Sequence, residues 1–384
     1  MSSGLQGLLA VVAVMTAAPF IGRLLAGRVP TVALQMLGGI LVGPAGLGWL
    51  VPSPAMDLFA KIGLGLIFAL IGLSMDQSTL RGVAGRLGAF GWAATVGVGV
   101  LLAVTLPLGG GLRPIALVVA LSSTALSTLV VILRDSGEWG SPLGRLLLSA
   151  GTWGQVCPLL AVALLLGTAS PLATVLSVAL LALVAALLAF VPDQITQTTP
   201  AWSWLRSVVA VSATTPLQVL LLLVVGLMAL SVGLGVDILL GTMLAGLVMR
   251  RYIAEPECSA ALKQLEALSY GFLVPLFFVV AGSRLDLDAV VAHPWGPLLC
   301  LGGILLMRGL PQWLLYCRAL PDRRERLRFV LLVSQSLNLP IVVGYLEVQA
   351  GLMSPQVEAA LVGGSLLSVL LLPVFAVALK RPPA

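Results

Sequence analysis

Residues 113–167, RPIALVVALSSTALSTLVVILRDSGEWGSPLGRLLLSAGTWGQVCPLLAVALLLG, contain two apolar runs that are each interrupted by polar residues near the middle. Ser122-Ser123-Thr124 interrupts the first run and Gly154-Gln155 the second. At a helical rise of about 1.5 Å per residue, both interruptions fall near the centre of a bilayer about 30 Å thick. Polar groups are costly at that depth and usually mark a functional site. The stretch therefore predicts two membrane-spanning helices with a polar site at their centre.

The composition of the whole chain indicates the same class of protein. Of its 384 residues, 59% are hydrophobic and only 9% are charged, and the mean hydropathy is +1.10. Such a chain cannot cover a soluble domain with polar side chains, so we expect an all-α polytopic membrane protein. The net charge of +6 does not indicate a nucleic-acid partner, because the basic residues lie in short loops between apolar runs, as orientation signals do.

The residues that usually carry metal or enzyme chemistry are sparse. The four cysteines lack CxxC spacing, and His293 is the single histidine, which cannot build a metal site alone. We find no nucleophile–base pair and no phosphate-binding glycine loop. We therefore expect no metal, no cofactor and no enzymatic activity.

Hydropathy predicts thirteen membrane spans. They are centred on residues 5–27, 31–50, 57–76, 87–107, 113–133, 142–167, 171–191, 205–231, 235–250, 264–282, 294–318, 327–347 and 355–379.

The distribution of the basic residues supports this count. Of the 21 basic residues, 17 lie in loops that follow odd-numbered spans, 3 lie on the other side (Lys61, Arg113 and Arg284), and one, Arg308, lies within a span. By the positive-inside rule, we expect the N-terminus outside and the C-terminus in the cytoplasm. We expect the chain to span the inner membrane of its cell. The 17 are Arg23, Arg28, Arg81, Arg86, Arg134, Arg145, Arg206, Arg250, Arg251, Lys263, Arg318, Arg323, Arg324, Arg326, Arg328, Lys380 and Arg381.

Span twelve repeats the pattern of span five. Its run RFVLLVSQSLNLPIVVGYLEV is cut by Ser334–Pro340, and Pro340 lacks a backbone donor and clashes with the preceding helical turn. We therefore predict a broken helix in both spans. The neighbouring spans each carry a central polar residue, Gln155 and Arg308, and Arg308 is too deep to reach either membrane surface, so it is a candidate for the transport site or for a helix-to-helix clamp.

The two broken helices are seven positions apart in the order of the spans, and an odd offset reverses their orientation in the membrane, as an inverted-topology repeat requires. We predict a single transmembrane domain with repeat one over residues 5–167, a connector at 171–191 and repeat two over residues 205–379. No soluble C-terminal domain is expected after the last span. Half-helix ends at both breaks would present backbone groups to an ion at the midplane.

Several stretches resemble the Kef-type branch of the monovalent cation:proton antiporters, over essentially the whole chain. They are PTVALQMLGGILVGPAGLGWL, LGLIFALIGLSMD, ALSSTAL, LGTMLAGLVMR, FLVPLFFVVAGSRLDL and ALVGGSLLSVLLLPVFAVAL. The resemblance implies the sodium/proton-antiporter fold, with a core of spans four to six and eleven to thirteen in which spans five and twelve cross. It also implies an elevator-like movement of this core, alternating access and a homodimer.

One departure from the family concerns the transport site. Members carry an aspartate on span six that binds cation and proton alternately, but here Gly154 and Gln155 stand at that place. An antiporter needs a group that titrates in the working pH range, and a glutamine amide cannot exchange a proton. With Arg308 charged, the site is net positive and repels a bare cation.

Three hypotheses follow. The first is a carrier that exchanges Na⁺ or K⁺ for protons; the second is a carrier for an anion or a neutral solute that is not coupled to protons; the third is a membrane module without transport activity. The candidate ion-binding or substrate-binding residues are Ser122, Ser123, Thr124, Gly154, Gln155, Arg308, Ser336 and Asn338.

Overall fold

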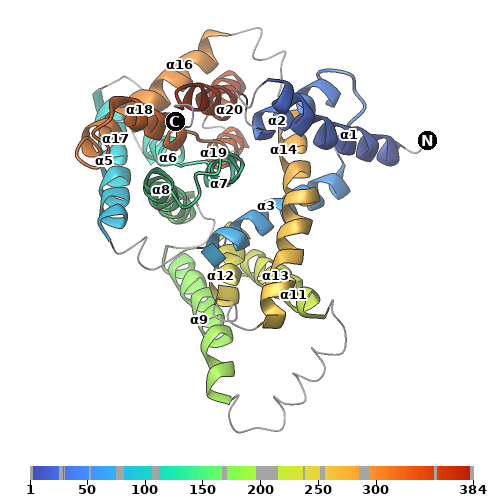
Figure 1. The fold of residues 1–384 in the computed structure, drawn as a ribbon. Helices are drawn as coiled ribbons and strands as arrows, with labels where there is room; N and C mark the ends of the chain where they lie inside the picture. The colour runs from blue at the N-terminus through green and yellow to red at the C-terminus, as the bar shows by residue number, and fades with distance from the viewer. Residues whose placement is uncertain are drawn as a thin grey trace. The chain divides into compact units, whose positions relative to one another are not determined.

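The chain is all-helical in the part that the structure, a computed structural model, describes (Figure 1). The described residues are 3–25, 29, 31–51, 53–74, 82–105, 112–166, 171–195, 215–236, 238–250, 256–284, 294–349 and 353–380. Eight of their helices are long and apolar enough to cross a membrane, and three shorter apolar helices accompany them. The chain is therefore a multi-pass membrane protein, as expected, while the number of thirteen spans stays a prediction.

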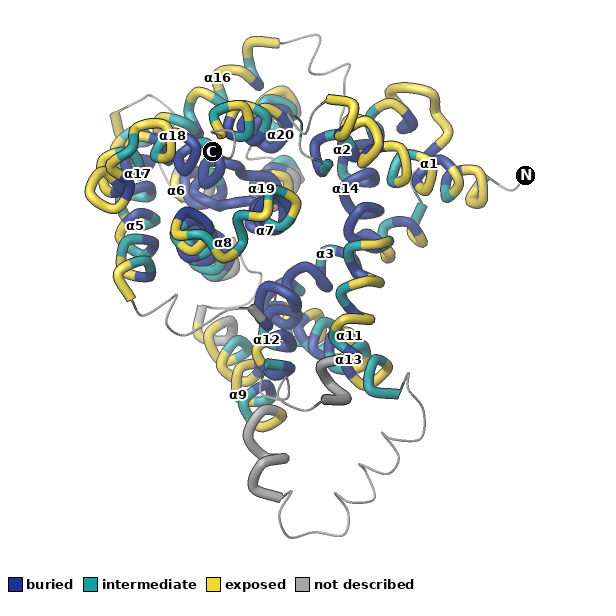
Figure 2. The backbone as a smooth tube through the Cα atoms, viewed as in Figure 1, coloured by how far each residue is buried: buried dark blue, intermediate teal, exposed yellow. Residues whose placement is uncertain are grey.

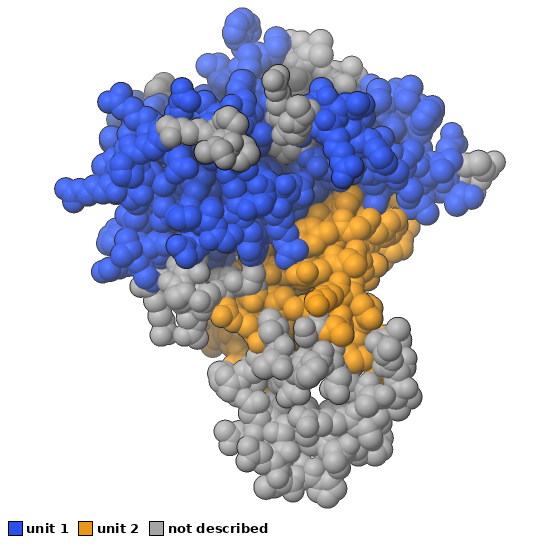
Figure 3. Space-filling model, in the orientation of Figure 1, with its two compact units in different colours: residues 1–53, 76–166, 278–384 blue, residues 54–75, 167–277 orange. Residues whose placement is uncertain are grey.

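The described chain divides into two compact units (Figure 3). Unit 1 comprises residues 1–53, 76–166 and 278–384, and unit 2 comprises residues 54–75 and 167–277. All six spans predicted for the core fall in unit 1, together with spans one and two. The repeats predicted from sequence do not follow these boundaries, because each repeat contributes to both units.

Unit 1 is built from most of the helices. Helix α2 packs against α1, α7 and α20, and α5 packs against α6, α8 and α17. The helices are α1 (Ser3–Leu24), α2 (Thr31–Val42), α5 (Val83–Thr105), α6 (Leu112–Leu121), α7 (Leu126–Asp135), α8 (Pro142–Leu166), most of α14 (Val274–Ser283), α16 (Trp295–Ile304), the π-helical η2 (Leu305–Gly309), α17 (Leu310–Leu315), α18 (Arg323–Val333), α19 (Asn338–Gln349) and α20 (Pro355–Ala378).

Unit 2 contains α3 (Pro54–Ser74), α9 (Pro171–Ile195), α11 (Thr215–Gly233), α12 (Ile238–Arg250), α13 (Pro256–Leu268) and the π-helical η1 (Ser269–Leu273). Glycines allow α3 and α12 to touch backbone to backbone. A Cβ on Gly246 would lie 1.9 Å from the carbonyl oxygen of Ala69, and one on Gly72 would lie 2.1 Å from that of Met243. Small residues are the usual means of close helix approach in membranes.

Burial follows the layout expected in lipid (Figure 2). In unit 1, α7 is buried from Leu126 to Leu133, whereas large apolar side chains of outer helices are exposed, including Phe90 and Leu299. Exposed apolar side chains are suited to hydrocarbon, so these faces fit contact with lipid. The residues between the half-helices, 122–125 and 334–337, are buried as well, so both breaks lie in the interior of unit 1.

Span two is shorter than predicted. Helix α2 ends at Val42, whereas the hydropathy placed the span at residues 31–50. Pro44 cannot continue the hydrogen-bond ladder, and the chain turns back so that the Leu50 N–H donates to the carbonyl of Val42 at 2.8 Å. Gly48 takes φ 66° in this turn, a conformation that glycine adopts without a steric penalty.

Candidate functional site

The two predicted helix breaks exist, and they touch each other. Residues 122–125 separate α6 from α7, and residues 334–337 separate α18 from α19. The Ala125 N–H donates to the carbonyl of Gln335 at 2.7 Å, and the hydroxyl oxygens of Ser123 and Ser336 are 2.7 Å apart. The two broken helices therefore cross at their breaks, as the predicted fold requires.

Prolines explain why backbone groups are free at this crossing. Pro158 lies inside α8 and has no N–H to donate to the carbonyl of Gly154, four residues earlier. That carbonyl instead accepts the N–H of Thr124 at 2.7 Å. Pro340 lies in the first turn of α19, where a missing N–H is tolerated, but its ring prevents α18 from continuing into α19.

Arg308 lies in the π-helical segment η2, close to the crossing. Pro311 follows this segment by two residues, and Pro275 follows η1 by the same interval. A proline ring displaces the carbonyl four residues before it, so a local widening of the helix accommodates each proline. Single π-helical turns are frequent at functional sites, and this one carries the guanidinium into the interior of unit 1.

The surroundings of Arg308 are unusual for a buried charge. Its side chain is 1% exposed, and Nη2 donates to Oγ1 of Thr124. The Nε and Nη1 groups have no hydrogen-bond partner among the described residues. Gly154 completes the contact, because a Cβ there would lie 2.3 Å from Thr124 Oγ1 and 2.9 Å from Arg308 Nη2.

The remaining predicted site residues are Gln155, Ser122 and Asn338. Gln155 is 2% exposed beside Gly154, and its Nε2 has no partner among the described residues. Ser122 is turned away from the Ser123–Ser336 contact, since its hydroxyl donates to the carbonyl of Val119 at 2.7 Å. Asn338 begins α19 at the break, but its side chain lies outside what the structure describes.

Three further side chains support the crossing, and sequence reasoning did not include them among the site residues. Trp92 in α5 donates through Nε1 to the Ser122 hydroxyl at 3.1 Å. The Ser368 hydroxyl in α20 accepts the N–H of Ser336 at 3.0 Å. Gln335 donates through Nε2 to the carbonyl of Leu332 at 2.9 Å, so it caps the end of α18. The polar run around Gln335 was a usable signal, whereas Trp92 and Ser368 lie on helices that read as plain apolar spans.

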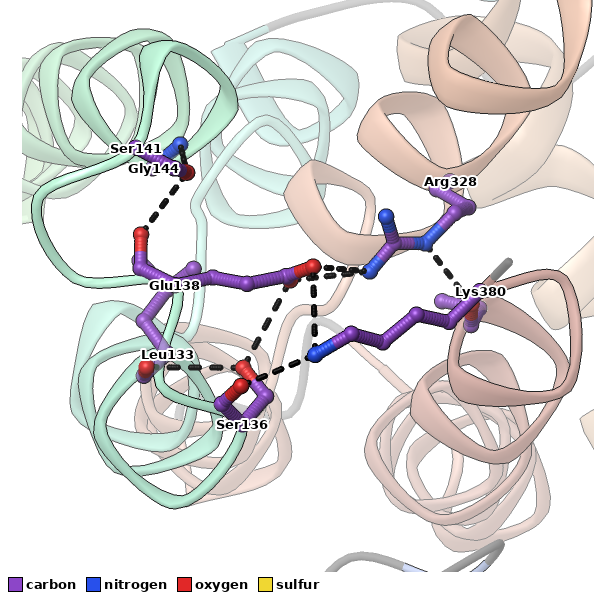
Figure 4. Close-up of polar contacts among 8 residues, drawn as sticks. Leu133, Ser136, Glu138, Ser141, Gly144, Arg328 and Lys380 are labelled. Atoms are coloured by element: carbon purple, nitrogen blue, oxygen red, sulfur yellow. Dashed lines mark hydrogen bonds and ion pairs between the residues drawn. The ribbon is translucent and has the colours of Figure 1, made fainter. Parts of the chain in front are cut away.

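A second polar cluster joins other ends of these helices (Figure 4). Both carboxylate oxygens of Glu138, in the turn between α7 and α8, accept from Nη2 of Arg328, at 2.9 and 2.8 Å. Arg328 also donates through Nε to the carbonyl of Ala376 at 3.1 Å, and Lys380 lies 3.4 Å from Glu138. The cluster links α7, α18 and α20 on the side that the loop charges predict to be cytoplasmic.

A cavity of about 710 Å³ lies in unit 1 next to this cluster. The ends of four helices surround it, and it contains charged groups of both signs. The lining residues are Pro19, Gly22, Arg23, Val29, Thr31, Ile132, Asp135, Ser136, Val377 and Lys380.

Comparison with known proteins identifies the family of this chain. A family model described as the transmembrane part of sodium/hydrogen exchangers matches residues 8–379, almost the entire chain. The chain belongs to the sodium/hydrogen exchanger family. This family consists of transporters rather than enzymes, and the Kef-type resemblance seen in the sequence is confirmed.

Individual relatives agree with this membership. The chain is 28% identical over 359 residues to the glutathione-regulated potassium-efflux system protein KefC of Klebsiella pneumoniae, and 29% identical over 366 residues to KefC of Cronobacter sakazakii. Each alignment covers 90% of this chain and 56% of the relative, so the chain spans just over half the length of these curated proteins.

The fold matches a solved exchanger. The sodium proton antiporter MjNhaP1 of Methanocaldococcus jannaschii, solved at pH 8, superposes with a TM-score of 0.67 and 19% identity, covering 98% of both chains. At this low sequence identity, the structural similarity to MjNhaP1 shows that the chain has the antiporter fold.

Proposed function

We propose that this exchanger-family protein is a secondary transporter that exchanges a monovalent cation, Na⁺ or K⁺, for protons by alternating access. The observation that carries the proposal is the hydrogen bond between Ala125 N–H and Gln335 carbonyl, which brings two helix breaks together. Unwound backbone and hydroxyl oxygens at such breaks are typical ion ligands in secondary transporters. Ser123, Thr124, Ser336 and Asn338 would supply oxygens at this place, with Gln155 beside them.

The proposed assembly and location follow the family resemblance and the loop charges. The chain would function as a homodimer in the cell's inner membrane, with its N-terminus outside and its C-terminus in the cytoplasm. The core would carry the ion across the membrane by moving as a body. Repeat one at 5–167 and repeat two at 205–379 would provide the two crossed halves of the mechanism.

Proton coupling requires a titratable group, and Gln155 cannot provide it. Among the described residues, Glu347 is the single buried acidic side chain, at 3% exposure. It lies in α19, the helix that begins at the second break, so it moves with that break. We assign the coupling carboxylate to Glu347 as part of this proposal. Asp76, an acidic residue at the end of predicted span three, is a second candidate, and it lies outside the described residues.

Reconstitution tests the proposed exchange directly. Proteoliposomes with an imposed pH gradient and a pH-sensitive dye receive Na⁺, K⁺ or Li⁺, and the expected result is cation-induced proton efflux. Empty liposomes and liposomes that contain an unrelated membrane protein are the controls. Absence of efflux with all three cations across the pH range would refute proton-coupled exchange.

A second candidate function rests on Arg308. Its unpartnered Nε and Nη1 groups favour a carrier that moves an anion or a neutral solute without proton coupling. This carrier predicts solute binding that Arg308→Ala abolishes, so binding that survives this substitution unchanged would count against it. A membrane module without transport activity would show neither cation-induced proton efflux nor solute flux.

A further inference from the structure

Among the described residues, none supplies a counter-charge to Arg308 in the site. Its side chain is 1% exposed, and its only described hydrogen bond ends on a neutral hydroxyl, that of Thr124. Among the described residues, the ionisable side chain that interacts electrostatically with Arg308 is Tyr316, whose phenol is neutral near pH 7. An uncompensated buried guanidinium costs several kcal/mol, so a folded protein compensates it in some way.

No described carboxylate is placed to act as the counter-charge of Arg308. Glu347, the single buried acid among the described residues, is nine positions after Asn338, which is about 13 Å along the helix from the break at a rise of about 1.5 Å per residue. The helix ends at the two breaks do not supply a counter-charge for Arg308 either. Two N-termini, of α7 and α19, meet two C-termini, of α6 and α18, so their partial charges largely offset one another.

Two residues, Arg308 and Gln155, carry unsatisfied donors. Arg308 Nη2 packs against Gly154, and Gln155, the next residue, carries an amide Nε2 that is buried and unpartnered. Arg308 contributes two more unpartnered N–H groups. These groups are all donors, and they belong to Arg308 and to a residue at the place where the family resemblance puts a carboxylate.

We propose that a small monovalent anion of chloride size binds beside Arg308 and Gln155 and replaces the missing carboxylate as a diffusible counter-charge. One negative charge neutralises the single guanidinium, and the unpartnered N–H groups would coordinate it. A neutralised site no longer repels a cation, so cation transport would depend on the anion. This last consequence rests on the proposed function, whereas anion binding does not.

Anion binding is tested on the purified full-length protein in detergent. Chloride is exchanged for gluconate at constant ionic strength, and the thermal unfolding midpoint Tm is measured. The expected result is a Tm that rises with chloride and saturates, together with binding of about one radiolabelled chloride per chain. Arg145→Met, which removes an exposed arginine, should keep both effects, and Arg308→Met should lose both.

The variant Gln155→Glu keeps the test decisive if Arg308→Met does not fold. Its carboxylate supplies the counter-charge covalently, so the chloride-dependent rise in Tm should disappear while the protein stays folded. A Tm that rises equally in the wild type and in Gln155→Glu, or wild-type protein that binds no chloride, would overturn the proposal.

Flux measurements separate the anion site from the transport function. Wild-type cation flux should fall in gluconate, Gln155→Glu flux should not, and chloride itself should not accumulate in the vesicles. Chloride accumulation would overturn the counter-charge role and support the second candidate function. Complete absence of cation flux would refute the proposed exchange, while the Tm and binding results would still decide the anion site.

Discussion

The carbonyl of Gly154 accepts the N–H of Thr124 at 2.7 Å, which connects the middle of α8 to the first helix break. In a continuous helix this carbonyl would accept an N–H four residues later, but Pro158 has none. A sequence feature that normally weakens a helix therefore provides an acceptor between helices. Gly154 also lies beside Arg308, since a Cβ there would be 2.9 Å from Nη2, so this turn of α8 contacts both Thr124 and Arg308.

Pro158→Ala should impair transport without unfolding the protein. The new N–H at position 158 would compete for the Gly154 carbonyl and free Thr124 from it. Proline within a helix costs about 3 kcal/mol, so the Tm should stay the same or rise while cation flux falls. Pro373→Ala in α20 is the matched control, and it should leave flux unchanged. Equal flux in wild type and Pro158→Ala would contradict a role for this hydrogen bond in positioning the break.

Gly154→Ala should destabilise the protein, because its Cβ would fall 2.3 Å from Thr124 Oγ1 and 2.9 Å from Arg308 Nη2. Overpacking of this kind costs about 1–3 kcal/mol, which lowers Tm. Gly97→Ala in α5 is the matched control, because no atom lies within 4 Å of a Cβ there. Alanine is favoured over glycine in a helix, so this control should unfold at the same or a higher temperature. A similar Tm for both variants would show that Gly154 is not tightly packed.

The central features of the site could be predicted from sequence because they depend on local chemistry. Ser122–Thr124 and Ser334–Pro340 place polar groups and a proline in apolar runs, and these are the places where the helices break. Arg308 stood out because a charge in the middle of a span is rare.

Other features depend on partners that are distant in sequence. Nothing around Trp92 indicates its hydrogen bond to Ser122, and the π-helical turn at Arg308 requires both Pro311 and the surrounding packing. The early end of α2 had a visible signal in Gly43-Pro44. The hydropathy prediction nevertheless extended the span to residue 50, because the residues after Val42 are still apolar.

Glu347→Gln should abolish cation-induced proton movement if Glu347 is the coupling carboxylate. The substitution keeps the size of a side chain that is 3% exposed but removes its ability to release a proton. Glu325→Gln, which changes an exposed carboxylate in α18, is the control and should retain exchange. Dye-reported proton efflux in proteoliposomes measures both. Wild-type exchange in Glu347→Gln would exclude this residue and move the search to Asp76.

The Glu138–Arg328 pair should contribute more to stability than the neighbouring contact of Lys380. Arg328 and Glu138 are joined by two hydrogen bonds, at 2.9 and 2.8 Å, and their side chains are 6% and 16% exposed. Glu138→Gln removes the charge at almost constant size and should cost about 1–3 kcal/mol, because charge-assisted hydrogen bonds between largely buried groups are the strong ones.

The Lys380 side chain is 36% exposed and lies 3.4 Å from the carboxylate. Solvent screens such a contact, so Lys380→Met should cost about 0–1 kcal/mol. A double-mutant cycle of Glu138→Gln with Arg328→Met, followed by thermal unfolding, isolates the coupling of the buried pair. A coupling energy no larger than that of the Glu138–Lys380 cycle would mean that water reaches the pair. The cluster would then not hold α7, α18 and α20 together.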